Sequence, residues 1–403
     1  MSRPQHEVAE IFRRFGATFR HVNEGHLSLG QLKVMAAIEK CRTAALGGHV
    51  DRCDGCGHTR ISYNSCGNRH CPKCQAVAAK EWLAERLVDL LPVPYFHVVF
   101  TIPEQLNAVV YQNKTLVYDI LFKAAAETVL ILAADPKRLG AKVGATAVLH
   151  SWGSAMTFHP HVHMIVTGGG IALDGQRWIS SKQDYFLPIP VLRTLFRRLF
   201  LEKLRAAHEQ LKFLGDISGL ADADAFRRFL APLRQVNWVI YAKPPFGGPE
   251  QVLAYLARYT HRIAISNSRI VNIDENNVSF RYKDRRNGKV RIKVMTVSGT
   301  EFIRRFLLHV VPDGFHRIRH YGLLASGHKA KNLARARELL NVPPPEPMAS
   351  NEVVDEDGVI HEDSTLPPCP CCGGRMVIIE WFERGCLPRH QPSPPKPPIL
   401  DTS

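Results

Sequence analysis

Two cysteine pairs in the first fifth of the chain have the spacing of zinc ligands. Two residues separate Cys53 from Cys56 and Cys71 from Cys74, and fourteen residues separate the pairs. Two such pairs can supply four thiolates to one tetrahedral zinc ion, and the glycine or proline beside each pair suits a tight turn. We therefore predict one structural zinc site on these four cysteines. Such a site is closed to substrate, so chemistry must come from elsewhere.

Other potential zinc ligands occur on either side of these pairs. Two cysteines and two histidines nearby have less regular spacing and could replace ligands or form a second site: Cys41, His49, Cys66 and His70. A set near the end of the chain has the spacing C-x2-C-x13-C-x3-H and is a candidate for a small zinc site: Cys369, Cys372, Cys386 and His390. The sequence alone leaves both sets unassigned.

Three histidines alternate along a segment that is predicted to be a strand: His159, His161 and His163. Alternate side chains of a strand share one face, and two imidazoles about 7 Å apart along it can face the same divalent cation. The alternative is a row of polar side chains on the wet face of a strand. Because the surrounding stretch has no charged residue and is largely apolar, unpaired imidazoles would be costly there, and we favour a metal site.

Tyr255 and Tyr259 are four residues apart in a predicted helix that covers about residues 249–261. This spacing places both phenols on one helix face, with Arg258 and Arg262 offset to one side. Packing of an amphipathic helix would explain an isolated tyrosine pair. A tyrosine attacks a phosphodiester when a metal or arginines polarise the phosphate. The histidine strand and the two arginines would provide that polarisation.

Positive charge is concentrated downstream of the tyrosines. Residues 258–338 contain 18 Lys and Arg against 6 Asp and Glu, which accounts for most of the net charge of +15. Seven basic residues lie on or between two predicted strands, interleaved with Phe280 and Tyr282: Arg281, Lys283, Arg285, Arg286, Lys289, Arg291 and Lys293. A solvated basic face is the alternative, but a hairpin that grips a phosphate backbone and stacks bases explains the pattern better.

The elements that position these residues follow from hydrophobic periodicity and turn signals. Two helices are expected in the first 40 residues, and an amphipathic helix at 114–135 should pack on a sheet. Strands that surround the histidines are expected at 95–102, 145–150 and 161–167. Further strands are expected at 269–273, 278–284 and 290–297, before a helix at 300–309. This order of elements suits an α+β sheet protein.

Composition narrows the class of protein and its partners. The 403 residues are 45% hydrophobic and 22% charged, as in a globular protein of two or three domains. The excess of positive charge favours a polyanionic partner. No secretory signal or membrane segment is evident, so we expect a cytoplasmic protein without a membrane partner. In a reducing compartment, Cys-x-x-Cys pairs favour metal binding over disulfides.

Taken together, the motifs resemble the transposases of the HUH endonuclease superfamily. The chain is most similar to the two-tyrosine rolling-circle transposases of the insertion-sequence-ninety-one family. The resemblance covers about residues 20–340 and rests on the cysteine module, the strand at 97–103, the histidine strand, the Tyr255-x3-Tyr259 pair and the block at 301–312. The combination of motifs is specific, whereas each motif alone is not.

The resemblance implies a ferredoxin-like antiparallel sheet as the nuclease core, with the tyrosine helix against it. It also implies that His161 and His163 bind Mg²⁺ or Mn²⁺, with His159 as a possible third ligand. Tyr255 and Tyr259 would attack single-stranded DNA at transposon ends, form 5′-phosphotyrosine links and join the strands to target DNA. The alternatives are a zinc-containing DNA-binding regulator without catalysis, or a plasmid replication initiator or relaxase with the same chemistry.

These observations predict five segments. The expected parts are N-terminal helices (1–40), a zinc-binding module (41–75), the endonuclease core (76–265), a basic DNA-binding β/α region (266–342) and a proline-rich, cysteine-containing, partly disordered tail (343–403).

Overall fold

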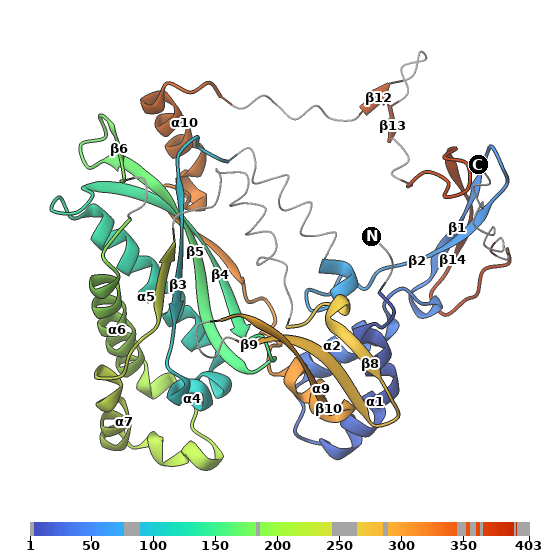
Figure 1. Cartoon of the computed structure of the whole chain (residues 1–403), viewed down its shortest axis with the longest axis horizontal. Coiled ribbons are helices and arrows are strands. Elements are labelled where there is room, and N and C mark those ends of the chain that lie inside the picture. The colour runs from blue at the N-terminus through green and yellow to red at the C-terminus, as the bar shows by residue number, and fades with distance from the viewer. Residues whose placement is uncertain are drawn as a thin grey trace. The chain divides into compact units, whose positions relative to one another are not determined.

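The computed structural model divides the chain into two compact units. It describes residues 4–75, 89–182, 186–243, 264–284, 289–344, 352–354, 360–362, 366–390 and 392 (Figure 1). Residues 1–31 and 75–345 form the first unit, and residues 32–74 and 346–403 form the second. The second unit therefore combines two segments that lie far apart in the sequence. Among the described residues, every helix is too short or too polar to span a bilayer.

An antiparallel sheet forms the centre of the first unit. Its strands follow the order β11–β4–β5–β3–β7, and β6 also pairs with β5. They are β3 (Tyr95–Thr101), β4 (Ala141–Trp152), β5 (Phe158–Ala172), β6 (Trp178–Ser180), β7 (Ile240–Lys243) and β11 (Ile318–Gly322). The expectation of a mixed α and β protein with antiparallel sheets is confirmed. The hairpin of β4 and β5 is longer than its predicted strands at both ends, and most of the added residues are buried.

Helices α5 (Lys114–Ala134) and α6 (Ile189–Ala206) pack against each other and cover one face of this sheet (Figure 1). The apolar side chains of β5 between the histidines, Val162 and Met164, point into this core and are fully buried. The remaining described helices of this layer are α4 (Asn107–Gln112) and α7 (Ala223–Leu230). One face of β5 is thus fixed by burial, so the histidines must occupy the opposite face.

Among the described residues, one helix covers part of the opposite face of the central sheet. Helix α10 (Lys329–Leu340) contributes Leu333 to a smaller core with Val148 and Ile165 from the sheet. Because Val148 and Ile165 alternate with the residues of the larger core, they share their face with the histidines of β4 and β5. The histidines lie further along the same two strands, where the hairpin approaches its turn.

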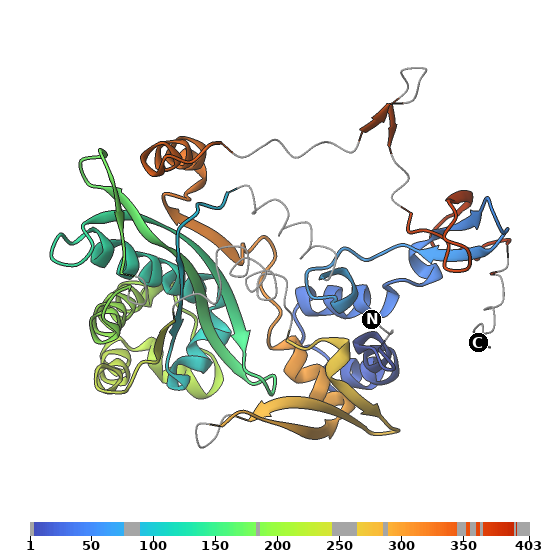
Figure 2. The same ribbon diagram turned by 45° about the horizontal axis from the view of Figure 1, so that its top comes forward.

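A second, three-stranded sheet completes the first unit (the yellow and orange strands in Figure 2). Its strands are β8 (Ile270–Ile273), β9 (Asn277–Asp284) and β10 (Arg291–Ser298), close to the predicted positions. Helix α9 (Gly299–Leu307) packs on it, and helix α1 (Val8–Val22) packs on α9. The rings of Phe280 and Phe302 meet at 5.8 Å between sheet and helix, and those of Phe12 and Phe306 meet at 5.2 Å between the helices.

The turn of the central hairpin touches this second sheet. The backbone N–H of Lys283 donates to Ser154 Oγ at 2.5 Å, and the guanidinium of Arg269 donates to the carbonyl of Ser154. Arg305 of α9 also donates to the carbonyl of Ala155, at 3.4 Å. The histidine-bearing hairpin and the basic strands are therefore joined directly within the first unit.

The second unit contains a three-stranded antiparallel sheet in the order β14–β1–β2. Its strands are β1 (Gly48–Cys53), β2 (Thr59–Tyr63) and β14 (Met376–Phe382), preceded by α2 (Leu29–Lys40), and a separate hairpin comprises β12 (Glu352–Val354) and β13 (Ile360–Glu362). The buried carboxylate of Asp51 in β1 accepts hydrogen bonds from Arg60 at 2.8 Å and Ser62 at 2.9 Å. Part of the expected tail is thus an ordered strand of the cysteine module.

Candidate metal and nucleic-acid sites

Three histidines converge on one face of the central hairpin. His161 and His163 come from β5, and His150 of β4 lies directly opposite His161 in the strand register. One ring nitrogen from each histidine lies within 4.8 Å of one from each of the others. The expected metal ligands His161 and His163 are therefore neighbours of a third imidazole. Sequence reasoning missed His150 because it belongs to another strand, and only the register brings it to His161.

The remaining expected candidate, His159, takes a different position. Its backbone carbonyl lies 2.7 Å from Nδ1 of His161, and its ring is not part of the three-histidine group. The structure thus places His150, rather than His159, as the third imidazole. The ring of His150 neighbours both others, with centroids 5.5 Å from His161 and 4.5 Å from His163, whereas His159 precedes both on the same strand, which is the physical reason for this correction.

Hydrogen bonds orient the histidine rings. Nδ1 of His161 can donate to the carbonyl of His159, and Nδ1 of His163 lies 2.8 Å from Nε2 of His97 on β3. The rings of His97 and His163 are also nearly parallel, with centroids 5.0 Å apart and an interplanar angle of 4°. Metal-binding histidines commonly use their second nitrogen for such an outer contact. The contacts through Nδ1 therefore favour Nε2 as the ligand atom of both rings.

Burial favours the neutral form of the imidazoles of His161 and His159. Burial lowers the pKa of His161 to about 4. Part of the side chain nevertheless stays accessible to solvent. Burial also lowers the pKa of His159. A neutral imidazole is the form that binds metals, and the lowered pKa of His161 leaves its ring in this form near neutral pH. Three nitrogen donors on one face can hold a first-row divalent ion and leave coordination positions for other ligands.

A fourth histidine, His309, lies beside this hairpin but is enclosed. Its side chain is 3% exposed, and its ring nitrogens lie 3.1 Å from the carbonyl of Met156 and 3.3 Å from Ser151 Oγ. Burial lowers the pKa of His309 to about 3. Because each ring nitrogen has a polar partner, we assign His309 a structural role.

The expected nucleophiles lie outside the described residues. Tyr255, Tyr259, Arg258 and Arg262 all belong to the segment 244–263, which follows β7. The helix expected at 249–261 therefore stays a prediction. So do the roles of Arg285 and Arg286, which lie between β9 and β10 and are also outside the described part of the chain.

Strands β9 and β10 form a ribbon whose far end is exposed and basic. Strand β8 pairs with β9 only as far as Phe280, and beyond it the two strands continue without a third among the described residues. Five expected DNA-binding side chains of the described residues are exposed on this part of the chain: Arg281, Lys283, Lys289, Arg291 and Lys293. A two-stranded ribbon with exposed cations can follow a phosphate backbone.

Register and burial refine which ribbon residues can contact a ligand. Arg281 and Lys283 lie on one face, whereas Lys293 lies on the other face and forms an ion pair with Asp284 at 2.7 Å. Phe280, which the sequence suggested for base stacking, is instead fully buried against Phe302. Alternation explains this difference, because Phe280 points to the face that α9 covers.

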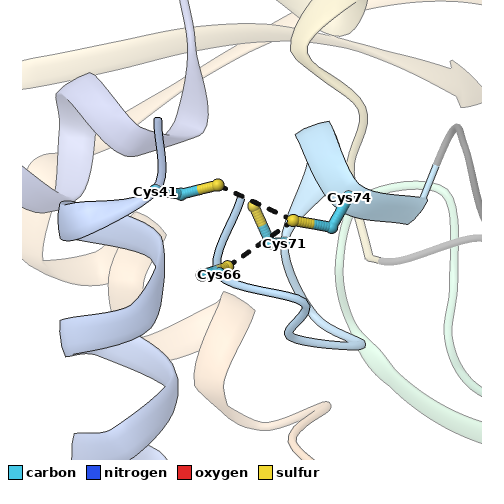
Figure 3. Close-up of side chains that lie close together, drawn as sticks. All are labelled: Cys41, Cys66, Cys71 and Cys74. Carbon is cyan, nitrogen blue, oxygen red and sulfur yellow. Dashed lines mark hydrogen bonds between the residues drawn. The ribbon is translucent and has the colours of Figure 1, made fainter. Parts of the chain in front are cut away.

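The cysteines of the second unit form two clusters rather than one. The first cluster contains Cys41, Cys66, Cys71 and Cys74 (Figure 3), whose sulfurs all lie within 4.8 Å of one another. Sγ of Cys74 lies 3.6 Å from Sγ of Cys41 and 3.6 Å from Sγ of Cys66. Sulfurs about 3.8 Å apart are expected around a tetrahedral zinc ion with bonds of about 2.3 Å. The cluster therefore has the ligands and spacing of a structural zinc site.

The second cluster contains Cys53 and Cys56 together with Cys369 and Cys372. The predicted single site on Cys53, Cys56, Cys71 and Cys74 is thus corrected, because its two pairs belong to different clusters. The physical reason is the pairing of β14 with β1, which sets Cys53 opposite Met376 and brings the tail cysteines to the end of β1.

The candidate tail site, which the sequence left unassigned, does not include Cys386 and His390. Neither residue belongs to a cysteine cluster of the described residues, and Nδ1 of His390 lies 2.6 Å from Oε2 of Glu380. The regular spacing of these residues therefore did not indicate a shared metal.

The thiols of the first cluster form hydrogen bonds with one another. Contacts from Cys66 and Cys71 lower the pKa of the Cys41 thiol, while the contact with Cys41 raises the pKa of Cys66. Zinc binds the thiolate form, so metal binding to such a cluster displaces these shared protons.

Two protein families match successive ranges of this chain. A family model described as "Transposase zinc-binding domain" matches residues 11–102, and one described as "Putative transposase" matches residues 144–332. The first range includes the whole first cysteine cluster, and the second includes the three histidines, the tyrosine pair and the basic ribbon. The zinc-binding family supports a structural role for zinc in this chain.

Two relatives align over most of their length. "Putative transposase y4qJ" of Sinorhizobium fredii (strain NBRC 101917 / NGR234) is 54% identical over 389 residues, which are 95% of this chain and 97% of that protein. "Transposase for insertion sequence element IS801" of Pseudomonas savastanoi pv. phaseolicola is 27% identical over 373 residues, 88% of this chain and 85% of that protein. No solved structure shows a significant match.

Proposed function

Because the chain belongs to the insertion-sequence-ninety-one family of transposases, we propose that it cuts and joins single-stranded DNA through Tyr255 and Tyr259. The substrate would be the ends of a mobile element. The observation that carries this proposal is the convergence of His150, His161 and His163 on one sheet face. A site for a divalent metal next to a phosphodiester is what a tyrosine nucleophile requires.

The three imidazoles would hold the metal through nitrogen atoms. Bound there, a divalent ion would polarise the phosphate and orient it for in-line attack. Mg²⁺ prefers oxygen ligands, whereas imidazole suits later first-row ions, so we expect Mn²⁺ to support the reaction better than Mg²⁺. His97 would orient His163 through the contact of 2.8 Å between their rings.

In the proposed reaction, the phenolic oxygen of a tyrosine attacks the scissile phosphorus. The bond from phosphorus to the 3′-oxygen breaks, the phenolic proton is lost, and the leaving strand ends in a 3′-hydroxyl. The other strand end keeps a 5′-phosphotyrosine link. A 3′-hydroxyl can then attack this link and release the tyrosine. The link conserves the energy of the broken bond, so joining needs no nucleotide cofactor. Two tyrosines would let one site hold a link while it cuts again.

The basic ribbon would hold the substrate strand. Arg281 and Lys283 are exposed on the same face of the ribbon, and Ser154 connects this ribbon to the turn of the histidine hairpin. Cationic side chains beside a metal site would bind the phosphates that flank the cut. This arrangement favours a DNA strand that extends from the histidine face along β9 and β10.

The proposal is tested with labelled single-stranded DNA from both flanks and both strands of the element. The protein is incubated with each DNA, with and without Mn²⁺, and the products are separated on a denaturing gel. We expect a slow, protease-sensitive, Mn²⁺-dependent band that disappears in the double variant Tyr255→Phe/Tyr259→Phe. DNA retarded on a native gel, without a covalent band on any strand, would instead support a DNA-binding regulator without catalysis.

Two histidine variants test the metal site separately. His150→Ala removes a ring nitrogen of the three-histidine group, so we expect at least a 100-fold loss of covalent product and much weaker Mn²⁺ binding by calorimetry. His159→Ala keeps the backbone carbonyl that contacts His161, so activity and Mn²⁺ binding should stay within about threefold of wild type. The opposite ranking of these two variants would show that His159, and not His150, is the third ligand.

A further inference from the structure

We propose that Cys53, Cys56, Cys369 and Cys372 bind a second zinc ion, which fastens the C-terminal segment to the N-terminal cysteine module. The zinc-binding family model covers only residues 11–102 and so includes half of these ligands. All four sulfurs lie within 4.8 Å of one another. The first cluster already has four cysteines. Cys53 and Cys56 therefore supply two of the four ligands of a separate site.

The sulfur distances fit a metal and not a disulfide. Sγ of Cys53 lies 3.4 Å from Sγ of Cys372, and Sγ of Cys56 lies 3.6 Å from Sγ of Cys369. A disulfide needs about 2.05 Å, whereas sulfurs around tetrahedral zinc are about 3.8 Å apart. Each contact joins one Cys-x-x-Cys pair to the other, as expected when each pair supplies two of the four ligands of a tetrahedral ion.

The two cysteine pairs adopt the same turn. The N–H of Gly57 donates to the carbonyl of Cys53 at 3.0 Å, and the N–H of Gly373 donates to the carbonyl of Cys369 at 2.9 Å. Both glycines directly follow the second cysteine of their pair and have positive φ, +69° and +74°. Segments more than three hundred residues apart thus form matching knuckles.

A second backbone contact also repeats in both knuckles. The N–H of Cys53 donates to the carbonyl of His58, and the N–H of Cys369 donates to the carbonyl of Gly374, each at 2.9 Å. A Cβ at Gly374 would lie 3.2 Å from the sulfurs of both Cys372 and Cys53. Glycine therefore lets the second knuckle approach the thiols of the first. Such matched, closely approaching turns are typical of paired zinc knuckles.

Strand pairing places the two knuckles against each other. Cys53 ends β1 and lies opposite Met376, which begins β14. Met376 is buried and packs with Cys53 and Cys369. The metal would therefore close the end of a sheet that the backbone has already aligned, and its ligands need little rearrangement to bind.

Zinc content of the full-length protein tests the proposal. We expect two zinc ions per wild-type chain by mass spectrometry of the purified protein, and one in Cys369→Ser/Cys372→Ser. The matched control is Cys386→Ser, an exposed cysteine of the same segment outside both clusters, which should keep two. One zinc in the wild type, or two in Cys369→Ser/Cys372→Ser, would overturn the proposal.

A combined variant distinguishes loss of this site from general unfolding. Cys53→Ser/Cys56→Ser should also retain one zinc, and a variant with all four substitutions should still retain one, because both pairs serve the same ion. Cobalt substitution gives a second readout: cobalt–thiolate absorption should fall by about half in each of these variants. Complete loss of metal from either double variant, or different contents in the two, would contradict a shared site.

Discussion

The buried histidine His309 contributes to how the stability of this protein responds to acid. His309 is 3% exposed, and burial lowers its pKa to about 3, whereas an unfolded histidine has a pKa of about 6.5. Between these values the unfolded chain binds more protons than the folded chain. The stabilising effect of the neutral ring is fully present above about pH 6.5 and is lost as pH falls toward about 3.

His309→Gln should weaken this pH dependence. Glutamine does not titrate but keeps an amide for the contacts with Met156 and Ser151. Each pH unit below about 6.5 costs wild type up to about 1.4 kcal/mol through this ring. Between about pH 7 and about pH 5, the free energy of unfolding should therefore fall about 2 kcal/mol less in His309→Gln, as measured by urea denaturation. Equal pH dependence in both proteins would show that His309 does not carry the effect.

Residue spacing could predict some ligands of the candidate sites, but not their groupings. His161 and His163 share a face by simple alternation, so the strand pattern was sufficient to place them together. His150 joins them only because β4 and β5 pair in one register. Likewise, Cys71 and Cys74 lie with Cys41 and Cys66, which were noted in the sequence but had no regular spacing. Pairing partners that are distant in sequence are set by tertiary structure.

At the level of elements, the ribbon of β9 and β10 should account for much of the DNA affinity. Arg281→Ala/Lys283→Ala removes two exposed cations from one face. Each phosphate contact contributes about 0.7 to the slope of log affinity against log salt for single-stranded DNA. We expect the slope to fall by about 1.4, as measured by fluorescence anisotropy over a salt series.

Two further variants make this test specific to the ribbon. Arg228→Ala removes an exposed cation from α7 and should leave the salt slope unchanged. Lys293→Ala should have a smaller effect than Lys283→Ala, because Asp284 already pairs with Lys293 at 2.7 Å. If Arg228→Ala lowered the slope as much as the ribbon variants, binding would depend on net charge rather than on this element.

Hydrophobic periodicity was sufficient for most elements of the first unit. Helix α5 and strands β3, β8, β9 and β10 lie within about one residue of their predicted bounds, because each has a strong apolar pattern and clear turn signals. Strand β14 could not be predicted in the same way. It follows a cysteine-rich and proline-rich stretch, and it is stabilised by pairing with a strand more than three hundred residues earlier.

For the whole molecule, the main organising feature is that the second unit is discontinuous. Residues 32–74 and 346–403 belong to it, and residues 75–345 form most of the first unit between them. A division by sequence order assigns these segments to different domains. The charge is also unevenly distributed, because residues 258–338 hold most of the net positive charge. The cysteine module and the basic surface are therefore distinct parts of the protein.

The order of synthesis gives this discontinuity a consequence for the cell. Cys56 leaves the ribosome 313 residues before Cys369, its neighbour in the second cluster. At 5–20 residues per second, this interval lasts roughly 15–60 s. A chain that stops early lacks β14 and two of the four sulfurs, so its cysteine module stays unfinished. Closure of that module thus requires translation through β14, and a chain that stops before it keeps Cys53 and Cys56 without their two partner cysteines and β1 without β14.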